Sequence, residues 1–429
     1  MRLALPPGAR SVPKPDSPLS AALLLISIHT YSEVSNMNQN ILSAKLQAIM
    51  DNAVAQNEVA GVNLLVLQNG KELLYAQSGY ADLEAKHPLQ KDTIFRLYSM
   101  SKPITAAAAM ILMERGIIDL CDPVKKFLPG FQNQKVAKGD ELVPVRRDCT
   151  IRDLLSMTSG LLYGGTDKAG KAAEAVIEEA KARMDGPDAL STVELANRLG
   201  SQPLFFHPGE HFNYGTSADI LGAVIEVASG MRFGEFLRKE IFEPLQMNDT
   251  DFSIPSDKQN RRAKSYEPDK NGLLVEYPTN NLAISYTMET YPAFESGGAG
   301  LASTLPDYAR FASMLLNGGT LDGVSILKPE TVRYMTTGQL LPWQQEDMWK
   351  SWDGLTGYSY GNLMRVAKDP GMAPLLATAG EYGWDGWLGA YFSNHPAEKI
   401  TFLLGMQKRD AGTTSLTRRL RNCVFAELL

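Results

Sequence analysis

The feature that most constrains this chain is an apolar run, Ala106 to Met113, which opens with four alanines and continues into methionine, isoleucine and leucine. At helical spacing this run leaves almost no polar face, and a helix that is apolar all round is buried rather than exposed. Gly116, with Ile117 behind it, is typical of the end of such a helix. We therefore predict a buried helix at the centre of the protein.

Shortly before this run, with Ile104-Thr105 between, stands Ser99-Met100-Ser101-Lys102-Pro103. Pro103 falls near the first turn of the predicted helix, where a missing N–H costs least. Residues three positions apart lie on one face of a helix, so Ser99 and Lys102 can touch, with Ser99 at the positive end of the helix dipole. A hydroxyl beside an amine is a nucleophile with its base, which makes both residues catalytic candidates.

The Ser-x-x-Lys spacing occurs at two other places, and its context there is wrong. Ser11 to Lys14 lies among prolines that exclude a helix, and Ser325 to Lys328 runs into Pro329, which disfavours helical backbone at the residue before it. Only Ser99 opens a helix. The alternative interpretation is an ordinary helix cap at Ser99 with a solvated Lys102, and the motif alone does not decide between the two.

Composition narrows the class of protein. The 429 residues are 44% hydrophobic and 21% charged, with a formal net charge of -6, which describes a globular chain without the basic excess of nucleic-acid-binding proteins. Cys121, Cys149 and Cys423 are odd in number and lack metal-ligand spacing, so we expect free thiols in a reducing, cytoplasmic compartment, and no metal or other cofactor. No apolar run reaches the roughly 18 residues of a transmembrane helix.

Residues 1–36 differ in kind from the rest of the chain. Several prolines and basic residues precede the short apolar run Ala21 to Ile28. This run could be the core of a signal peptide, but prolines and Asp16 stand in front of it and no small-x-small cleavage pattern comes after it. We predict an unstructured extension, with Met37 as the functional start.

The rest of the chain alternates between strand and helix signals. Asn69-Gly70 is typical of a β-hairpin turn, and Ser191 to Glu194 is a capping box. Besides the helix that Ser99 opens, the predicted helices are 41–55, 151–157, 171–183, 191–199, 218–228, 305–316 and 416–428. The predicted strands are 62–67, 72–77, 358–366, 387–393 and 399–406.

Strands near both ends with helices between them predict an α+β fold. One antiparallel sheet is assembled from both chain ends and flanked by helices, and a mainly helical domain is inserted in the middle. We place the sheet domain at 37–98 plus about 288–429 and the helical domain at about 99–287, with the active site in the cleft between them.

A second group of candidates lies in the loop Phe205 to Thr216, where Tyr214 stands just before a predicted helix. A tyrosine held there can point its hydroxyl into a cleft, and a nearby lysine ammonium eases the loss of its proton, so Tyr214 is a candidate general base. The alternative is a packed aromatic side chain.

Histidine does not supply a convincing base. His207 and His211 are four apart, but Pro208-Gly209 between them rules out the shared helix face of a zinc pair. Gly357 to Gly361 matches the G-x-S-x-G elbow around Ser359, yet it lacks the buried strand before it and the helix after it that the elbow needs.

A third group lies in Gly380 to Gly389, which contains Trp384-Asp385-Gly386-Trp387. Glycines let a substrate lie close to the backbone, and an edge strand beside Ser99 can offer a main-chain N–H. With the N–H of Ser99, that group would form an oxyanion hole for acyl transfer. The alternative is a glycine-rich turn between strands.

These three stretches, in this order and spacing, resemble the serine β-lactamase and penicillin-binding-protein superfamily, and most closely its β-lactamase-like carboxylesterases, the family VIII esterases. The resemblance covers about Ile41 to Leu428 and includes the flanking stretches Pro208-Gly209-Glu210, Asp219 to Gly222 and Gly297 to Leu301. It implies the α+β fold predicted above. It also implies four roles: acylated nucleophile for Ser99, proton relay for Lys102, base for Tyr214, and second oxyanion donor for the backbone of Trp387.

Two departures from the superfamily bear on the substrate. Thr216 stands where the tyrosine motif of class C β-lactamases ends in asparagine, and Trp384-Asp385-Gly386 replaces the Lys-Thr-Gly of penicillin-recognising enzymes. A tryptophan followed by an aspartate would attract a β-lactam carboxylate poorly or repel it. The resemblance therefore implies a serine esterase for short-chain, uncharged esters.

Three alternatives stay open beside this hypothesis. One is an acyltransferase on the same site, in which an alcohol replaces water in the second step. Another is a weak β-lactamase or a D-aminopeptidase-like amidase. The third is a catalytically inactive homologue that acts as a binding or regulatory module, against which the intact set of Ser99, Lys102 and Tyr214 argues.

Overall fold

The computed structural model describes residues 39–429. The predicted extension at 1–36, Met37 and the motif Ser11 to Lys14 lie outside the described residues. Within 39–429 no helix is both long enough and apolar enough to span a membrane.

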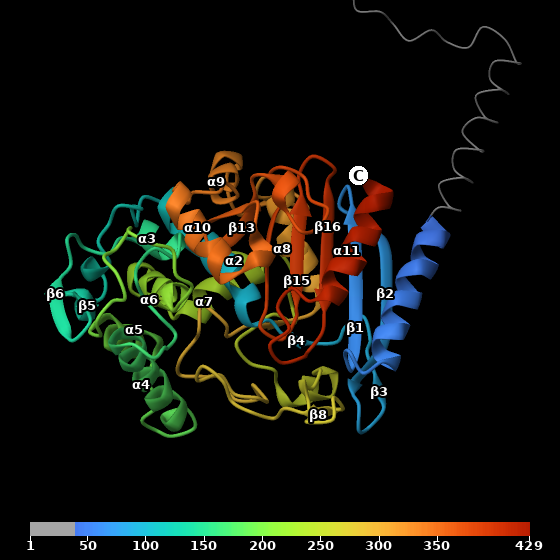
Figure 1. Ribbon diagram of the computed structural model, residues 1–429, viewed down its shortest axis with the longest axis horizontal. Coiled ribbons are helices and arrows are strands. Elements are labelled where there is room, and N and C mark those ends of the chain that lie inside the picture. The colour runs from blue at the N-terminus through green and yellow to red at the C-terminus, as the bar shows by residue number, and fades with distance from the viewer. Residues whose placement is uncertain (1–38) are drawn as a thin grey trace, which may run out of the picture.

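An eight-stranded antiparallel sheet, built from both ends of the chain, forms the centre of the molecule (Figure 1). Its strand order is β12-β13-β14-β15-β16-β1-β2-β3, so the N-terminal hairpin joins the C-terminal strands where β1 pairs with β16. These strands are β1 (Gly61–Gln68), β2 (Lys71–Asp82), β3 (His87–Pro88), β12 (Tyr358–Gly361), β13 (Met364–Ala367), β14 (Tyr382–Asp385), β15 (Tyr391–His395) and β16 (Ile400–Gly405). The predicted sheet is confirmed.

The side chains of β1 explain why helices cover both faces of this sheet. Successive residues of a strand point to opposite faces. Val62 and Leu64 pack in the cluster that holds the helix over 39–55 and α11 (Ser415–Leu428). Leu65 points the other way, into the core that contains α8 (Leu305–Leu316). The apolar run of β1 is therefore that of a strand buried on both sides.

Helix α2 (Ser101–Glu114) is buried from Ser101 to Leu112 and packs against α6 and α9, as the apolar run after Ser99 predicts. In Figure 1 most other helices lie to one side of the sheet. They are α3 (Ile151–Leu155), α4 (Lys168–Arg183), α5 (Thr192–Gly200), α6 (Ser217–Ser229), α7 (Phe233–Leu237), α9 (Pro329–Met335) and α10 (Pro342–Ser351). The predicted division into two domains stays a prediction.

Two predicted strands have the wrong extent. The stretch 358–366 is a hairpin, because Asn362 and Leu363 both adopt positive φ and reverse the chain between β12 and β13. The strand predicted at 387–393 is placed too early in the sequence. Residues 386–389 form a turn closed by a 2.8 Å backbone hydrogen bond, and β15 begins only at Tyr391. In addition, β14 pairs on both sides, so the strand predicted at the sheet edge is an interior one.

Four short strand pairs were not predicted, because two to four residues are too few to show a periodic pattern. They are β4 (Phe95–Arg96) with β9 (Ala302–Ser303), β5 (Lys135–Lys138) with β6 (Glu141–Pro144), β7 (Tyr266–Pro268) with β8 (Leu274–Glu276), and β10 (Thr320–Leu321) with β11 (Val324–Ser325). The β4–β9 pair matters for the site, since β4 leads directly into Ser99 and β9 leads into α8.

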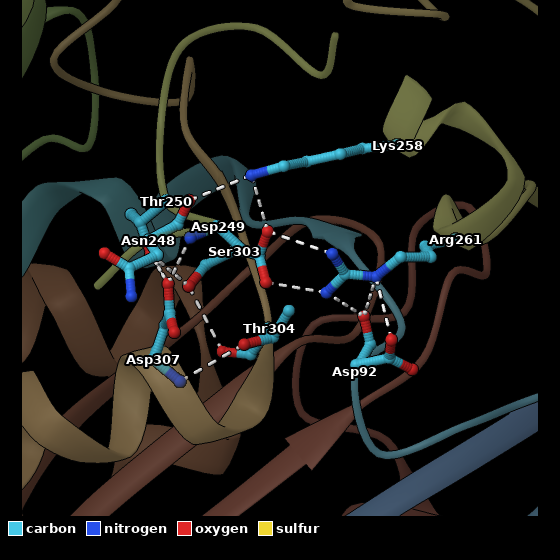
Figure 2. Close-up of polar contacts among 9 residues, drawn as sticks. All are labelled: Asp92, Asn248, Asp249, Thr250, Lys258, Arg261, Ser303, Thr304 and Asp307. Carbon is cyan, nitrogen blue, oxygen red and sulfur yellow. Dashed lines mark hydrogen bonds and ion pairs between the residues drawn. The ribbon is translucent and has the colours of Figure 1, made fainter. Parts of the chain in front are cut away.

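A polar cluster fastens the loop after α7 to the start of α8 (Figure 2). Asp307, in the first turn of α8, accepts hydrogen bonds from the N–H of Asp249 and the hydroxyl of Thr250, at 2.7 and 3.0 Å. Arg261 pairs with the carboxylates of Asp249 and Asp92, at 2.6 and 3.0 Å. Because Asp92 lies just before β4, this cluster holds the strand that leads to the candidate nucleophile.

Candidate active site

Ser99 lies in a 3₁₀ turn, Tyr98–Met100, that runs directly into α2. The sequence predicted Ser99 at the helix start, and the serine precedes the first α-helical residue by two positions. Tyr98 adopts a φ of 45°, which strains a residue with a side chain. Its ring packs 5.1 Å from that of Trp387, so the strained turn is held in place from the other side of the cleft.

Lys102 lies one helical turn after Ser99 and is completely buried. Its Nζ lies 3.1 Å from the Oγ of Ser99, 3.1 Å from the hydroxyl of Tyr163 and 2.8 Å from the carbonyl oxygen of Gly298. It forms no ion pair with a carboxylate within the described residues. The predicted contact between Ser99 and Lys102 is therefore present in the structure.

Burial lowers the pKa of Lys102 to about 7, although the carboxylates of Asp219 and Asp385 oppose the shift. A lysine in water has a pKa of about 10.4 and is almost always charged. Near neutral pH, a large fraction of Lys102 is instead a neutral amine, which can accept the proton of the adjacent serine.

The loop Ser296–Gly298 that contacts Lys102 is held by Asp219 of α6, a residue whose role sequence reasoning did not assign. Asp219 accepts hydrogen bonds from the hydroxyl of Ser296 and, at 2.9 Å, from the N–H of Gly298. A Cβ on Gly298 would lie 2.7 Å from the carboxylate of Asp219, so a larger residue there would push this side chain away. Both stretches were noted as flanking sequence, which was the signal available.

Tyr163 is a site residue that the sequence did not indicate. It lies in the loop between α3 and α4, and its hydroxyl accepts a hydrogen bond from the Nζ of Lys102. Burial raises the pKa of Tyr163, so its hydroxyl stays protonated. No motif surrounds this tyrosine in the sequence, because only the tertiary fold brings it to the lysine.

Tyr214 stands just before α6, as predicted, and its ring lies 4.6 Å from the Nζ of Lys102. Its hydroxyl accepts a hydrogen bond of 3.0 Å from the indole N–H of Trp384. Burial raises the pKa of Tyr214, although the Ser99 hydroxyl and the Trp384 indole oppose the shift. The phenol therefore keeps its proton near neutral pH and is poorly suited to start as the base.

The end of β14 approaches the nucleophile turn at Gly386. A Cβ at this position would lie 2.2 Å from the carbonyl oxygen of Leu97, so the close approach requires glycine. Trp387 comes next in the turn. Within the described residues, neither its N–H nor that of Ser99 donates a hydrogen bond to the protein, and both residues line one cavity. An oxyanion hole requires two such free donors.

A cavity of about 640 Å³, here called the catalytic cavity, opens in front of these groups. Six of the seven predicted site residues line it: Ser99, Tyr214, Trp384, Asp385, Gly386 and Trp387. The seventh, Lys102, lies directly behind Ser99. The structure thus brings together all the residues that the sequence singled out for catalysis.

The charged lining of the catalytic cavity is mixed. Asp353, Asp385 and Asp410 face it, as do Arg365 and Arg418. The strand position of Trp384 offers no cation, as predicted, but Arg418 of α11 was not foreseen. Burial raises the pKa of Asp385, although Arg365 and a hydrogen bond from Thr413 oppose the shift.

The rejected candidates lie elsewhere. Ser359 is completely buried within β12, so the elbow interpretation is excluded. The ring of His211 contacts Asp347 at 2.9 Å, and that of His207 accepts a hydrogen bond from the N–H of Arg146. Lys328 has extended backbone ahead of α9, as Pro329 predicts. Within 39–429, no three potential metal ligands cluster together.

Comparison with known proteins agrees with this geometry. A family model described as Beta-lactamase matches residues 46–422. The protein Rv1367c of Mycobacterium tuberculosis is 34% identical over 360 residues, which cover 81% of this chain and 86% of the relative. Esterase EstB of Burkholderia gladioli is 30% identical over 401 residues, which cover 90% of this chain and 95% of that esterase.

Among solved structures, that of EstCE1, described as a hydrolase with promiscuous acyltransferase activity, superposes with a TM-score of 0.77. It is 24% identical in sequence, and the match covers 91% of this chain and all of that one. This similarity confirms the serine β-lactamase/transpeptidase-like fold. With the family match over most of its length, the chain belongs to the Beta-lactamase family and is a serine hydrolase by fold.

Proposed function

We propose that this protein is a carboxylesterase that cleaves short-chain, uncharged carboxylic esters through an acyl-enzyme on Ser99. The observation that carries the proposal is the buried Nζ of Lys102, 3.1 Å from the Oγ of Ser99, beside a cavity lined by Ser99 and Trp387, whose backbone N–H groups have no partner in the described protein. A nucleophile, its base and an oxyanion site are the parts that acyl transfer needs.

In the first step, the Oγ of Ser99 attacks the ester carbonyl and its proton passes to the Nζ of Lys102. The carbonyl oxygen becomes an oxyanion that the N–H groups of Ser99 and Trp387 stabilise. Collapse of this intermediate expels the alcohol, which takes its proton from the hydroxyl of Tyr214. The proton that Lys102 took from Ser99 then returns to Tyr214, whose ring centre lies 4.6 Å from the Nζ. In the second step, water attacks the acyl-enzyme through the same groups and releases the acid.

This scheme assigns the first proton transfer to Lys102. The superfamily resemblance implies instead that Tyr214 is the base. That role for Tyr214 stays a prediction. Electrostatics favours the lysine, because burial lowers the pKa of Lys102 and raises that of Tyr214.

The lining of the catalytic cavity supports a neutral substrate. Three carboxylates against two guanidinium groups give no net attraction for an anion, and Arg365 is already within 3.6 Å of Glu381. Aromatic side chains, including Trp352, Trp384 and Trp387, also line the cavity. Such a wall suits an uncharged acyl or alkoxy group.

Acyl transfer to an alcohol is the second candidate function. A cavity of about 640 Å³ has room for an acyl group and an acceptor together. EstCE1, which shares the fold, is described as having acyltransferase activity beside hydrolysis. The same acyl-enzyme would serve both reactions.

The experiment is a panel of p-nitrophenyl esters of increasing acyl length, run with and without an added primary alcohol. We expect saturable turnover of the short esters by the wild type and none by Ser99→Ala. Formation of a new ester with the alcohol would add transferase activity to the assignment. Equal rates in wild type and Ser99→Ala would contradict it.

A further inference from the structure

A second cavity lies behind the catalytic one. It measures about 390 Å³ and is here called the rear cavity. Part of its wall is apolar, with Ala180, Leu190, Phe252, Ile284, Met288 and Phe294. Polar side chains, among them Ser285, Thr287 and Thr290, also line it, and its two carboxylates, Asp185 and Glu289, are exposed. The buried apolar side chains, with the carboxylates exposed, leave a path along which a hydrocarbon chain can lie.

A narrow gap lies between the two cavities. Some of the residues that line the gap also line the catalytic cavity, and others also line the rear cavity. Leu282 and Tyr163 line the catalytic cavity and the gap. Ala283, Ala180 and Phe294 line the gap and the rear cavity. The gap itself holds only about 10 Å³, so the passage between the cavities is closed in this conformation.

The partition is the tip of a strained turn. Asn281 and Ile284 exchange backbone hydrogen bonds of 3.2 and 2.9 Å, and the two residues between them, Leu282 and Ala283, have φ values of 52° and 57°. Turns with positive φ at both central positions are normally made with glycine or asparagine, because other side chains are strained there. This strain narrows the free-energy difference between the closed turn and an open one.

We propose that the rear cavity binds the distal end of an ester's linear acyl chain, which passes Leu282 when the turn Asn281–Ile284 moves aside. Short acyl groups fit the catalytic cavity alone, whereas longer chains use both cavities. The inference rests on the proposed esterase function and extends its substrates to medium-chain acyl esters. Leu282 is then the residue that sets chain-length preference.

Two variants test the passage, because they should change the chain-length preference in opposite directions. Ala293→Trp fills the rear cavity from a half-buried position, and Leu282→Ala widens the gap. Each methylene moved from water into an apolar site favours binding about fourfold. We therefore expect Ala293→Trp to lower the decanoate-to-acetate ratio of kcat/KM at least roughly tenfold, and Leu282→Ala to raise it several-fold.

Leu273→Ala is the matched control, because Leu273 is exposed on the β7–β8 turn and lines none of these three cavities. The decanoate-to-acetate ratio of kcat/KM for Leu273→Ala should equal that of the wild type. If both test variants keep the wild-type ratio, even with slower turnover of both esters, the inference is wrong while the esterase assignment stands.

A binding measurement that needs no turnover tests the rear-cavity inference separately from the esterase proposal. Decan-1-ol titrated calorimetrically into the wild type should bind more tightly than into Ala293→Trp, by about tenfold or more. If acetate is not hydrolysed at all, the esterase proposal fails, and this titration alone decides whether the rear cavity takes an alkyl chain. Equal decanol affinities in the two proteins would overturn the inference.

Discussion

At the residue scale, the site depends on an amine that is buried without a carboxylate in contact. Lys102 touches two hydroxyls and one backbone carbonyl, while the nearest buried acid, Asp219, is occupied by Ser296 and Gly298. A salt-bridged lysine would have a raised pKa and would hold its proton. Here burial lowers the pKa of Lys102 more than the nearby carboxylates raise it, so the lysine can act as a base.

The pH dependence of acylation tests which group takes the serine proton. Because the pKa of Lys102 is about 7, the neutral amine is lost as pH falls below this value, and kcat/KM for an acetate ester should drop about tenfold per pH unit there. Above about pH 8 the rate should be level. A rate that continues to climb past pH 9 would instead favour the phenolate of Tyr214, whose pKa is raised.

Trp384→Lys tests why β-lactams are expected to be poor substrates. The variant restores a cation on the substrate strand but removes the indole donor to Tyr214. Ester turnover should fall, and the efficiency on a chromogenic cephalosporin relative to the ester should rise roughly 10- to 150-fold, the value of one charged hydrogen bond. No relative gain would mean that the missing cation is not what excludes the β-lactam, and Arg418 would then be the cation to examine.

Individual site residues could be predicted to different degrees. Ser99, Lys102 and Tyr214 were found because each stands at the start of a helix, where a local pattern places the side chain. Tyr163 could not be found, since its contact with Lys102 depends on how a loop folds over α2. Arg418 was missed for the same reason, because it reaches the catalytic cavity only after α11 has docked on the sheet.

At the element scale, a buried ionic cluster ties α11 to the sheet. Glu381, just before β14, accepts hydrogen bonds from Arg421 of α11 and, at 2.8 Å, from the hydroxyl of Tyr358. Arg365 of β13 lies 3.6 Å from the same carboxylate. Burial alone would raise the pKa of Glu381, but the charges of Arg421 and Arg365 lower it. The carboxylate therefore stays ionised between two buried cations.

Glu381→Gln should destabilise the protein strongly. Removal of the charge leaves two buried guanidinium groups unpaired, and breaking a buried pair in this way costs about 3–5 kcal/mol. Urea unfolding would measure the loss. The control is Glu427→Gln, which removes an exposed surface pair with Lys45 and should cost far less, because solvent screens that pair. Equal losses in the two variants would contradict a supporting role for the cluster.

Elements with long, regular patterns were predicted well, and irregular ones were not. Helix α8 matches its predicted range, and β1, β16 and α11 differ from theirs by a residue or so at each end. The hairpin between β12 and β13 was missed, because Asn362-Leu363 lacks the glycine that usually marks such a turn. The turn at Gly386 was assigned to a strand for the opposite reason, since the tryptophans on both sides of that glycine favour strands.

At the scale of the whole molecule, stability should depend on pH through a buried histidine. His395 of β15 is completely buried, and burial lowers its pKa to about 3. In the unfolded chain a histidine has a pKa of about 6.5, so between these two values the unfolded state binds a proton that the folded state does not. The free energy of unfolding should therefore fall as pH drops from about 6.5 towards 3.

Comparison of two variants isolates this effect from other titrating groups. His395→Phe should flatten the pH dependence of the unfolding free energy by up to ~1.4 kcal/mol per pH unit, the contribution of one proton. His87→Gln, at an exposed position of β3, should keep the wild-type slope. Identical slopes in wild type and His395→Phe would show that His395 is not the group responsible.

The central claim is that chemistry proceeds through an acyl group on Ser99, and trapping that intermediate tests it most directly. Wild type, Ser99→Ala and Ser359→Ala would each be mixed with p-nitrophenyl acetate, quenched in acid within the first turnover, and digested for mass spectrometry. We expect an acetyl group on the peptide that holds Ser99 in wild type and Ser359→Ala, and no acetylated serine in Ser99→Ala. Turnover without any adduct, or an acetyl group on Ser359 that persists in Ser99→Ala, would contradict the account.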